Sequence, residues 1–220
     1  MEFVSATVID ADNVFEISKN RGLNLLLSEH VNAEIKFVKA NATHAPLFPA
    51  CHALVNRTQG ENLVTVDYFA QAISNAERLL VLALLKGELI GVATARQLPS
   101  DGFAYYAPFG KEAVELFQRH RVGSMDCASV QEPWQGQGIG CELGRRRVAW
   151  LESIGCDAIV GISWESGLPH TSDRVFLRLG FERLARVSDF YVGISIQREM
   201  ICPVCGPPPC HCAASLFVKR

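Results

Sequence analysis

The sequence predicts an α/β fold, and three observations support this prediction. Almost half of the 220 residues (49%) are hydrophobic, which is enough for one large domain with a sizeable core. Short strand-like segments alternate with helical ones. A glycine-rich turn also joins a predicted strand to an amphipathic helix just after residue 135. The formal charge of −2 provides no strong field for nucleic acid or for an anionic membrane surface, so neither is expected as a partner.

The first half of the predicted domain begins at residue 34, and residues 1–33 are treated as an N-terminal extension. A strand is expected at 35–38, followed by helices at 44–58 and 66–76. The apolar segments 79–85 and 89–95 are separated by Lys86-Gly87-Glu88, which predicts a β-hairpin.

Residues 99–120 interrupt this pattern with two prolines and two glycines, and carry four aromatic residues, Phe103, Tyr105, Tyr106 and Phe109, before a short helical segment, so we interpret them as an insertion. Its aromatics could line an acceptor site, join two copies as a homodimer, or fill a satellite core. The second half then has strands and helices in alternation. The predicted segments are a strand at 123–130, a helix at 138–154, a strand at 157–163, a helix at 171–179, and strands within 182–192 and at 213–218.

The longest apolar run, residues 79–85, is far too short for a membrane helix, which needs about 20 residues. The first residues lack the basic and apolar regions of a signal peptide. We therefore expect a cytoplasmic protein with no membrane partner.

The turn Gln135-Gly136-Gln137-Gly138-Ile139-Gly140 lies between a predicted strand and helix, where backbone N–H groups can bind an anion. A P-loop would need Gly-Lys-Ser/Thr, which is absent, and a dinucleotide fingerprint would need Gly where Cys141 stands. Taken alone, the glycines are equally compatible with a tight turn and close helix packing.

Residues 130–140 resemble the acetyl-CoA motif of the GNAT superfamily of N-acetyltransferases, whose pattern is Gln/Arg-x-x-Gly-x-Gly/Ala. Gln135, Gly138 and Gly140 match it, and the Gly180-Phe181 pair is also typical of that family. The resemblance covers residues 34–220. It implies a mixed, mostly antiparallel central sheet flanked by helices. It also implies direct transfer of an acetyl group from acetyl-CoA to a primary amine in a ternary complex.

The resemblance also implies which residues hold acetyl-CoA. The glycine-rich turn would bind the pyrophosphate, and the main chain of Ala128 and Val130 would pair with the pantetheine and polarise the acetyl carbonyl. Many relatives have a proton-donating Tyr where this chain has Phe176, which would pack beside the cofactor, and Ser172, Tyr191 or water could donate instead. The implied cofactor-binding set is Ala128, Val130, Gln135, Gly136, Gln137, Gly138, Ile139, Gly140, Cys141 and Phe176.

An alkylamine must lose a proton before it attacks, so a base or an ordered water is expected. Asp126 is the first candidate because it is an even number of residues from Val130 on the same strand and should share its face. Glu165 and His170, just after the next strand, follow. The alternatives are that Asp126 only bonds neighbouring backbone and that His170 simply lies in a loop.

Four of the eight cysteines fall within eleven positions: Cys202, Cys205, Cys210 and Cys212. Their spacing predicts a structural zinc knuckle over residues 199–213, because four thiolates form a closed tetrahedral site. His211 could replace one cysteine, and disulfides or a redox pair are the alternatives, although a cytosolic setting disfavours stable disulfides. The knuckle would either shape acceptor recognition or only staple a long loop.

The expected acceptor is a small or amino-acid-like primary amine. A peptide acceptor, and hence a protein N-acetyltransferase, is one alternative. Another is a catalytically degenerate scaffold whose zinc knuckle binds a protein. Nucleic acid is not expected there, since residues 200–220 hold only two basic side chains.

Overall fold

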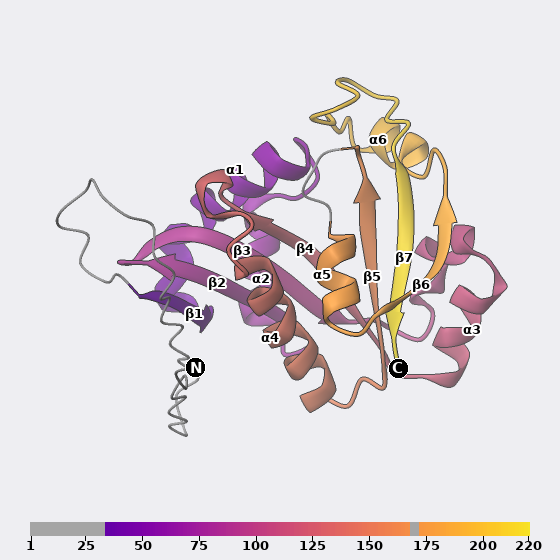
Figure 1. The fold of residues 1–220 in the computed structure, drawn as a ribbon, viewed down its shortest axis with the longest axis horizontal. Helices are drawn as coiled ribbons and strands as arrows, with labels where there is room; N and C mark the ends of the chain where they lie inside the picture. The colour runs from indigo at the N-terminus through magenta and orange to yellow at the C-terminus, as the bar shows by residue number, and fades with distance from the viewer. Residues whose placement is uncertain (1–33, 168–171) are drawn as a thin grey trace, which may run out of the picture.

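The computed structural model describes residues 34–167 and 172–220, and their seven strands form one sheet (Figure 1). The strand order is β1-β2-β3-β4-β5-β7-β6. Only β4 and β5 run parallel, so the predicted mixed, mostly antiparallel sheet is confirmed. The strands are β1 (Ile35–Lys39), β2 (Arg78–Leu85), β3 (Glu88–Gln97), β4 (Val122–Val130), β5 (Ala158–Glu165), β6 (Glu182–Val187) and β7 (Ala213–Lys219).

Helices cover both faces of the sheet (Figure 1). Side chains of α4 and α5 pack with alternate residues of β2 and β3 in one core, whereas α1 and α2 pack with the intervening residues in a second core on the opposite face. The helices are α1 (Phe48–Gln59), α2 (Val66–Ser74), α3 (Lys111–Arg119), α4 (Ile139–Ser153), α5 (Asp173–Arg178) and α6 (Val192–Gln197).

Two elements differ from the sequence prediction. The helix expected at 44–58 is divided into a 3₁₀ turn, Ala42–Leu47, and α1, which begins at Phe48 with Pro49 in its first turn, where proline is tolerated. The strand expected within 182–192 ends at Val187. Asp189 then adopts a positive φ of 53°, which breaks the extended backbone, and α6 follows.

Residues 99–120 form two 3₁₀ turns and α3 beside β6, on the C-terminal side of the sheet (Figure 1). Tyr106 and Phe109 are buried in a third hydrophobic cluster that also contacts Phe190. Phe103 and Tyr105 stay 40% and 46% exposed. Of the three roles considered for these aromatics, filling a satellite core therefore accounts for Tyr106 and Phe109.

None of the helices in the described part of the chain is both long and apolar enough to cross a bilayer.

Candidate active site

Strands β4 and β5 separate part of the way along their length. Their parallel pairing runs from Val122 and Ala158 to Met125 and Gly161, where it ends. Strand β5 remains paired with β7 as far as Glu165, and β4 remains paired with β3 as far as Val130. The edge of β4 that faces β5 is thus free of strand pairing after Met125. Ala128 and Val130, expected to hold a pantetheine chain, lie on this segment.

A β-bulge in β4 precedes this edge. The partners of Ala93 and Ala95 on β3 are Ala128 and Met125, so two residues of β4 stand opposite Thr94. The Thr94 hydroxyl accepts a hydrogen bond from the Cys127 backbone N–H at 3.3 Å. A bulge bends its strand and increases the local twist, which favours the divergence of β4 from β5.

The bulge also corrects one expectation. Asp126 contacts Tyr68 of α2, whereas Val130 packs with the core beneath α4. The two side chains therefore lie on opposite faces of the sheet, because the extra residue of the bulge breaks the simple alternation on which the prediction relied.

The glycine-rich turn is open to an incoming group. Gly136 and Gly138 have φ values of 72° and 88°, and a Cβ at either would meet no atom within 4 Å. Helix α4 begins at Ile139, so the N–H groups of its first turn point toward this open space. The Gln135 side chain donates to the Val130 carbonyl at 2.9 Å and joins the turn to the end of β4. This geometry fits an anion site, with the positive end of the α4 dipole at the turn.

Close helix packing instead involves Gly144, which lies one turn after Gly140 in α4. A Cβ on Gly144 would lie 2.5 Å from a Leu179 methyl carbon, whereas a Cβ on Gly140 would meet only Val175, at 3.7 Å. Close helix packing therefore accounts for Gly144 but not for Gly136, Gly138 or Gly140 of the turn.

Phe176 lies where the separation of β4 and β5 begins. Its ring is buried and stacks on Phe217 at a centroid distance of 5.1 Å. It also lies directly over Gly161, where a Cβ would overlap the ring. Of the two alternative donors, Ser172 already donates to Ser163 at 3.0 Å, and burial raises the pKa of Tyr191, which makes its hydroxyl a weaker acid.

Asp126 is held by side chains from three elements. Arg96 of β3 pairs with it at 3.2 Å, the Ser124 hydroxyl donates to it at 2.8 Å, and the Tyr68 hydroxyl donates at 3.4 Å. Burial raises the pKa of this carboxyl, which is 16% exposed, and the charge of Arg96 opposes that rise. The Tyr106 hydroxyl, from the 99–120 segment, donates to Ser124 at 3.1 Å.

The sequence offered no signal for Tyr68 or Arg96, because only tertiary packing brings their elements together. Tyr106 belongs to the 99–120 aromatics that were considered for an acceptor site. The prediction that Asp126 only bonds neighbouring backbone does not describe these contacts, which come from side chains.

The other two candidate bases have different outcomes. Glu165 accepts hydrogen bonds from Ser215 and, at 2.7 Å, from Arg186. The Ser215 hydroxyl and then Arg186 lower the pKa of Glu165, which makes it a weaker base than a free carboxylate. His170 lies outside the described residues.

The end of α1 meets β4 at its open edge. The Gln59 side chain donates to the Ala128 carbonyl and to the Ser129 hydroxyl, each at 2.8 Å, and the Thr58 hydroxyl donates to Ser129 at 2.7 Å. This polar group has no local sequence signal, because α1 and β4 are about 70 residues apart in the chain.

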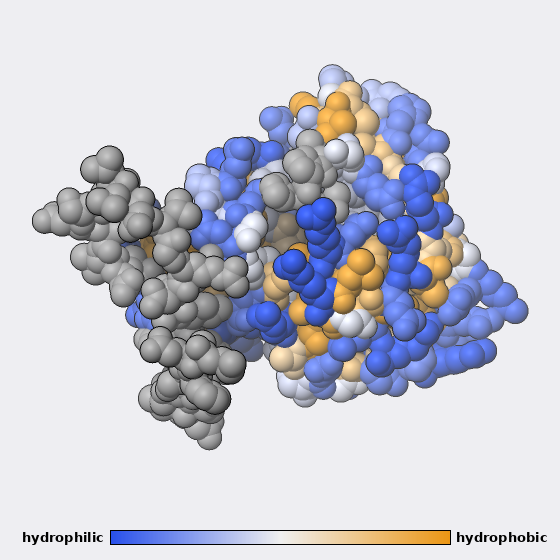
Figure 2. Space-filling view, viewed as in Figure 1, coloured by the Kyte–Doolittle hydropathy of each residue, from blue (hydrophilic) through white to orange (hydrophobic). Residues whose placement is uncertain are grey.

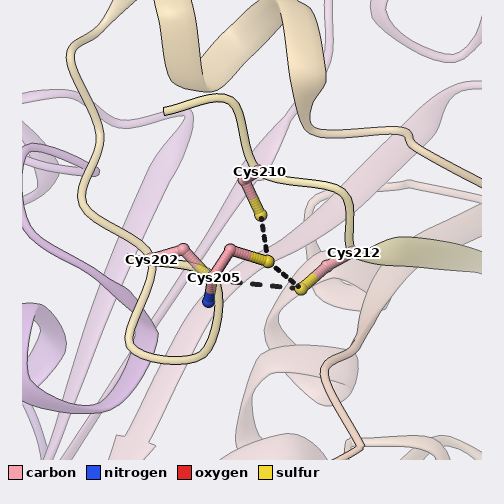
Figure 3. A group of neighbouring side chains, drawn as sticks. All are labelled: Cys202, Cys205, Cys210 and Cys212. Atoms are coloured by element: carbon pink, nitrogen blue, oxygen red, sulfur yellow. Dashed lines mark hydrogen bonds between the residues drawn. The ribbon is translucent and has the colours of Figure 1, made fainter. Parts of the chain in front are cut away.

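The four cysteines converge on one point (Figure 3). Their Sγ atoms all lie within 4.8 Å of one another, and three of the Sγ–Sγ distances are 3.5, 3.8 and 3.9 Å. A disulfide needs about 2.05 Å, whereas tetrahedral zinc with bonds of about 2.3 Å places its sulfurs about 3.8 Å apart. The backbone N–H groups of Val204 and Cys205 also point at Cys202 Sγ. His211 pairs with Asp189 at 2.8 Å instead of joining the cluster.

Comparison with known structures shows the same fold in several acetyltransferases. The acetyl-CoA complex of NAA60 from Arabidopsis thaliana superimposes with a TM-score of 0.59 at 16% identity, covering 84% of this chain and 97% of that one. The ribosomal-protein-S18-alanine N-acetyltransferase from Escherichia coli gives 0.55 at 14% identity, with 84% and 92% covered. The polyamine N-acetyltransferase from Drosophila melanogaster gives 0.58 at 14%, with 84% and 99% covered.

No curated protein sequence shows significant similarity to the chain. Residues 48–181, however, match the acetyltransferase (GNAT) family, and this region contains the bulged β4, the open turn and α4. The chain therefore belongs to the GNAT family of acetyltransferases.

Proposed function

We propose that this protein transfers an acetyl group from acetyl-CoA to a primary amine by direct transfer in a ternary complex. The observation that carries the proposal is the open edge of β4 beside the open glycine turn. Backbone groups of Ala128 and Val130 can pair with an extended pantetheine and donate to the acetyl carbonyl. The N–H groups of residues 137–141 can bind the pyrophosphate.

The acetyl thioester supplies an activated acyl group, and the chain supplies position and charge. The end of α1 orients the open edge, since Gln59 occupies the carbonyl of Ala128. Phe176 packs at the start of the separation and provides an apolar wall. It offers no proton, so the departing thiolate, with a pKa near 8.5, leaves unassisted or takes a proton from water.

Asp126 is proposed as the proton acceptor for the amine, through a water molecule because little of its side chain is exposed. A raised pKa makes a carboxylate a better base near neutral pH. Asp126→Asn should lower kcat/KM about 10²–10⁴-fold. The wild type should lose activity as the pH falls through the Asp126 pKa, and the Asp126→Asn variant should not show this loss. An equal reduction at every pH would contradict the assignment and leave Asp126 a positioning residue.

The proposed acceptor is a small, amino-acid-like amine. Its support is the pair of opposite charges on the α2 side of β4: Asp126, and Arg96, whose side chain is 40% exposed. A zwitterionic molecule can place its ammonium near the carboxylate and its carboxylate on the guanidinium. The related structures include both a polyamine and a ribosomal-protein acetyltransferase, so a peptide is the alternative acceptor.

The test is a transfer assay with purified protein and acetyl-CoA against amino acids, polyamines and peptides. Preferential acetylation of amino acids would support this acceptor class, and Arg96→Met should then raise KM for amino acids more than for polyamines. Preferential acetylation of peptides would overturn it in favour of a protein N-acetyltransferase. No transfer to any amine would contradict the enzymatic proposal.

We also propose that the four cysteines bind one structural zinc ion. The support is the Sγ spacing and the closed donor set of four thiolates. A reducing, cytoplasmic compartment would keep these thiols available for the metal. Elemental analysis should find one zinc per chain in the wild type and a large loss in Cys205→Ser. The matched control is the same substitution at the buried Cys156, which lies outside the cluster.

A scaffold without activity that binds a protein through the knuckle is the second candidate. Hydrophobic residues gather over α6 and the knuckle at the top of Figure 2. In these two segments Ile196, Ile201 and Val204 are 57%, 40% and 46% exposed. This candidate gains support only if acetyl-CoA fails to bind a folded, zinc-loaded sample.

A further inference from the structure

We propose that the four-cysteine site is a metal-dependent clamp. It would hold the loop between α1 and α2, residues 60–65, in the position that the acceptor side of the active site requires. This inference rests on the proposed metal site and on the proposed transfer to an amine. A local staple would fix only the knuckle itself. In the proposed clamp the metal also fixes residues 60–65, a loop that contributes no metal ligand.

Residues 198–201, at the start of the knuckle, and the α1–α2 loop are joined by four hydrogen bonds. Glu61 and Ile201 form an antiparallel bridge, with N–O distances of 3.0 and 3.3 Å. The Asn62 side chain donates to the Glu199 carbonyl at 3.0 Å. Arg198 donates to the Leu63 carbonyl at 3.1 Å. These contacts join segments about 137 residues apart in the sequence.

Packing reinforces the hydrogen bonds. Leu63 packs in the small hydrophobic cluster that contains Met200 and three of the four cysteines. A Cβ on Gly60 would lie 2.8 Å from the Ile201 carbonyl oxygen, and Gly60 has a φ of 122°. Glycine at this position therefore permits the close approach of the two backbones.

The clamp reaches both sides of the separation between β4 and β5. Gln59, the residue before Gly60, donates to the Ala128 carbonyl on the open edge of β4. Trp164, near the end of β5, packs against the cysteine cluster. A metal that fixes the cysteines would thus fix the α1 contact to β4 and the end of β5 together.

Hydrogen exchange followed by mass spectrometry tests the clamp without any turnover. The full chain is compared in its zinc-loaded form and after treatment with a chelator. We expect exchange at residues 60–65 to accelerate at least about tenfold, since two lost hydrogen bonds account for that factor. Exchange in α4 should not change. Faster exchange confined to residues 199–212 would overturn the proposal in favour of a local staple.

A variant that keeps all four cysteines covers the case in which chelation unfolds the whole chain. Asn62 has a φ of 61°, so Asn62→Gly removes its hydrogen bond to the Glu199 carbonyl without adding backbone strain. We expect unchanged zinc content and acetyl-CoA affinity, with about two- to tenfold faster exchange at residues 60–65. The KM for the acceptor should rise by a similar factor.

Lys86→Gly is the matched control. Lys86 also has a positive φ, 51°, but lies in the turn between β2 and β3, so its variant should change none of these quantities. Unchanged exchange in Asn62→Gly would refute the clamp. If exchange responds as expected but no amine is acetylated, the clamp stands as structural coupling and only the proposed function fails.

Discussion

Gly138 allows a direct test of the proposed anion site, by two substitutions that differ only in charge. It has a φ of 88°, and its Cβ position faces open space. Asn and Asp tolerate left-handed backbone better than other side chains, so both variants should fold with a similar loss of stability, at most about 1–2 kcal/mol. The Asp variant places a carboxylate where the α4 N–H groups would bind pyrophosphate.

Coulomb's law sets the size of the expected difference. Two unit charges 4 Å apart repel by about 1 kcal/mol in water and about 4 kcal/mol at an effective dielectric of 20. Gly138→Asp should therefore bind acetyl-CoA more weakly than Gly138→Asn by about five- to a thousandfold. Because the turn is exposed, the difference should shrink in high salt.

Calorimetric titration with acetyl-CoA at two salt concentrations measures both quantities, and thermal denaturation confirms that each variant is folded. Equal affinities for the two variants at low salt would refute the reasoning, because a carboxylate at this position cannot be neutral toward a bound pyrophosphate.

Three further predictions concern stability. Gly161→Ala should lower the free energy of unfolding, measured by chemical denaturation, by about 1–3 kcal/mol, because its Cβ overlaps the Phe176 ring. Phe176→Leu in the same chain should recover part of that loss, and additive effects of the two substitutions would contradict this explanation. Gly140→Ala, with its nearest contact at 3.7 Å, should not destabilise. Glu165→Gln should lower the free energy of unfolding by about 1 kcal/mol at neutral pH. The Ser215 hydroxyl lowers the folded-state pKa of Glu165, so the wild-type advantage should disappear as the pH falls through that lowered pKa, and a constant difference would contradict it.

Local patterns were sufficient for most of the fold. The hairpin of β2 and β3, the strand before the glycine turn and the amphipathic α4 all have side-chain periodicities that depend only on near neighbours in the chain. The spacing of the four cysteines likewise predicted their convergence, because the first and the last are only ten positions apart in the chain. The glycine turn was predictable for the same reason.

The active site could be predicted only in part. The orientation of Asp126, the first candidate base, was predicted wrongly, because one extra residue in the β4 bulge reverses the face on which the following side chains lie. The bulge is stabilised by the Thr94 hydroxyl and by Arg147, which is buried beneath the sheet and whose guanidinium lies 3.4 Å from the Thr94 carbonyl. The sequence of β4 itself does not indicate these two contacts, because they come from β3 and α4.

The sequence alone determined the order of the elements, the family resemblance and the chemistry available at the turn and at the cysteines, since these depend on residues close together in the chain. Only the tertiary structure decided where β4 leaves β5, which side chains surround Asp126 and that the knuckle contacts the α1–α2 loop. The physical reason is that hydrogen bonds and packing between distant segments depend on how the elements are brought together, and no local periodicity encodes that arrangement.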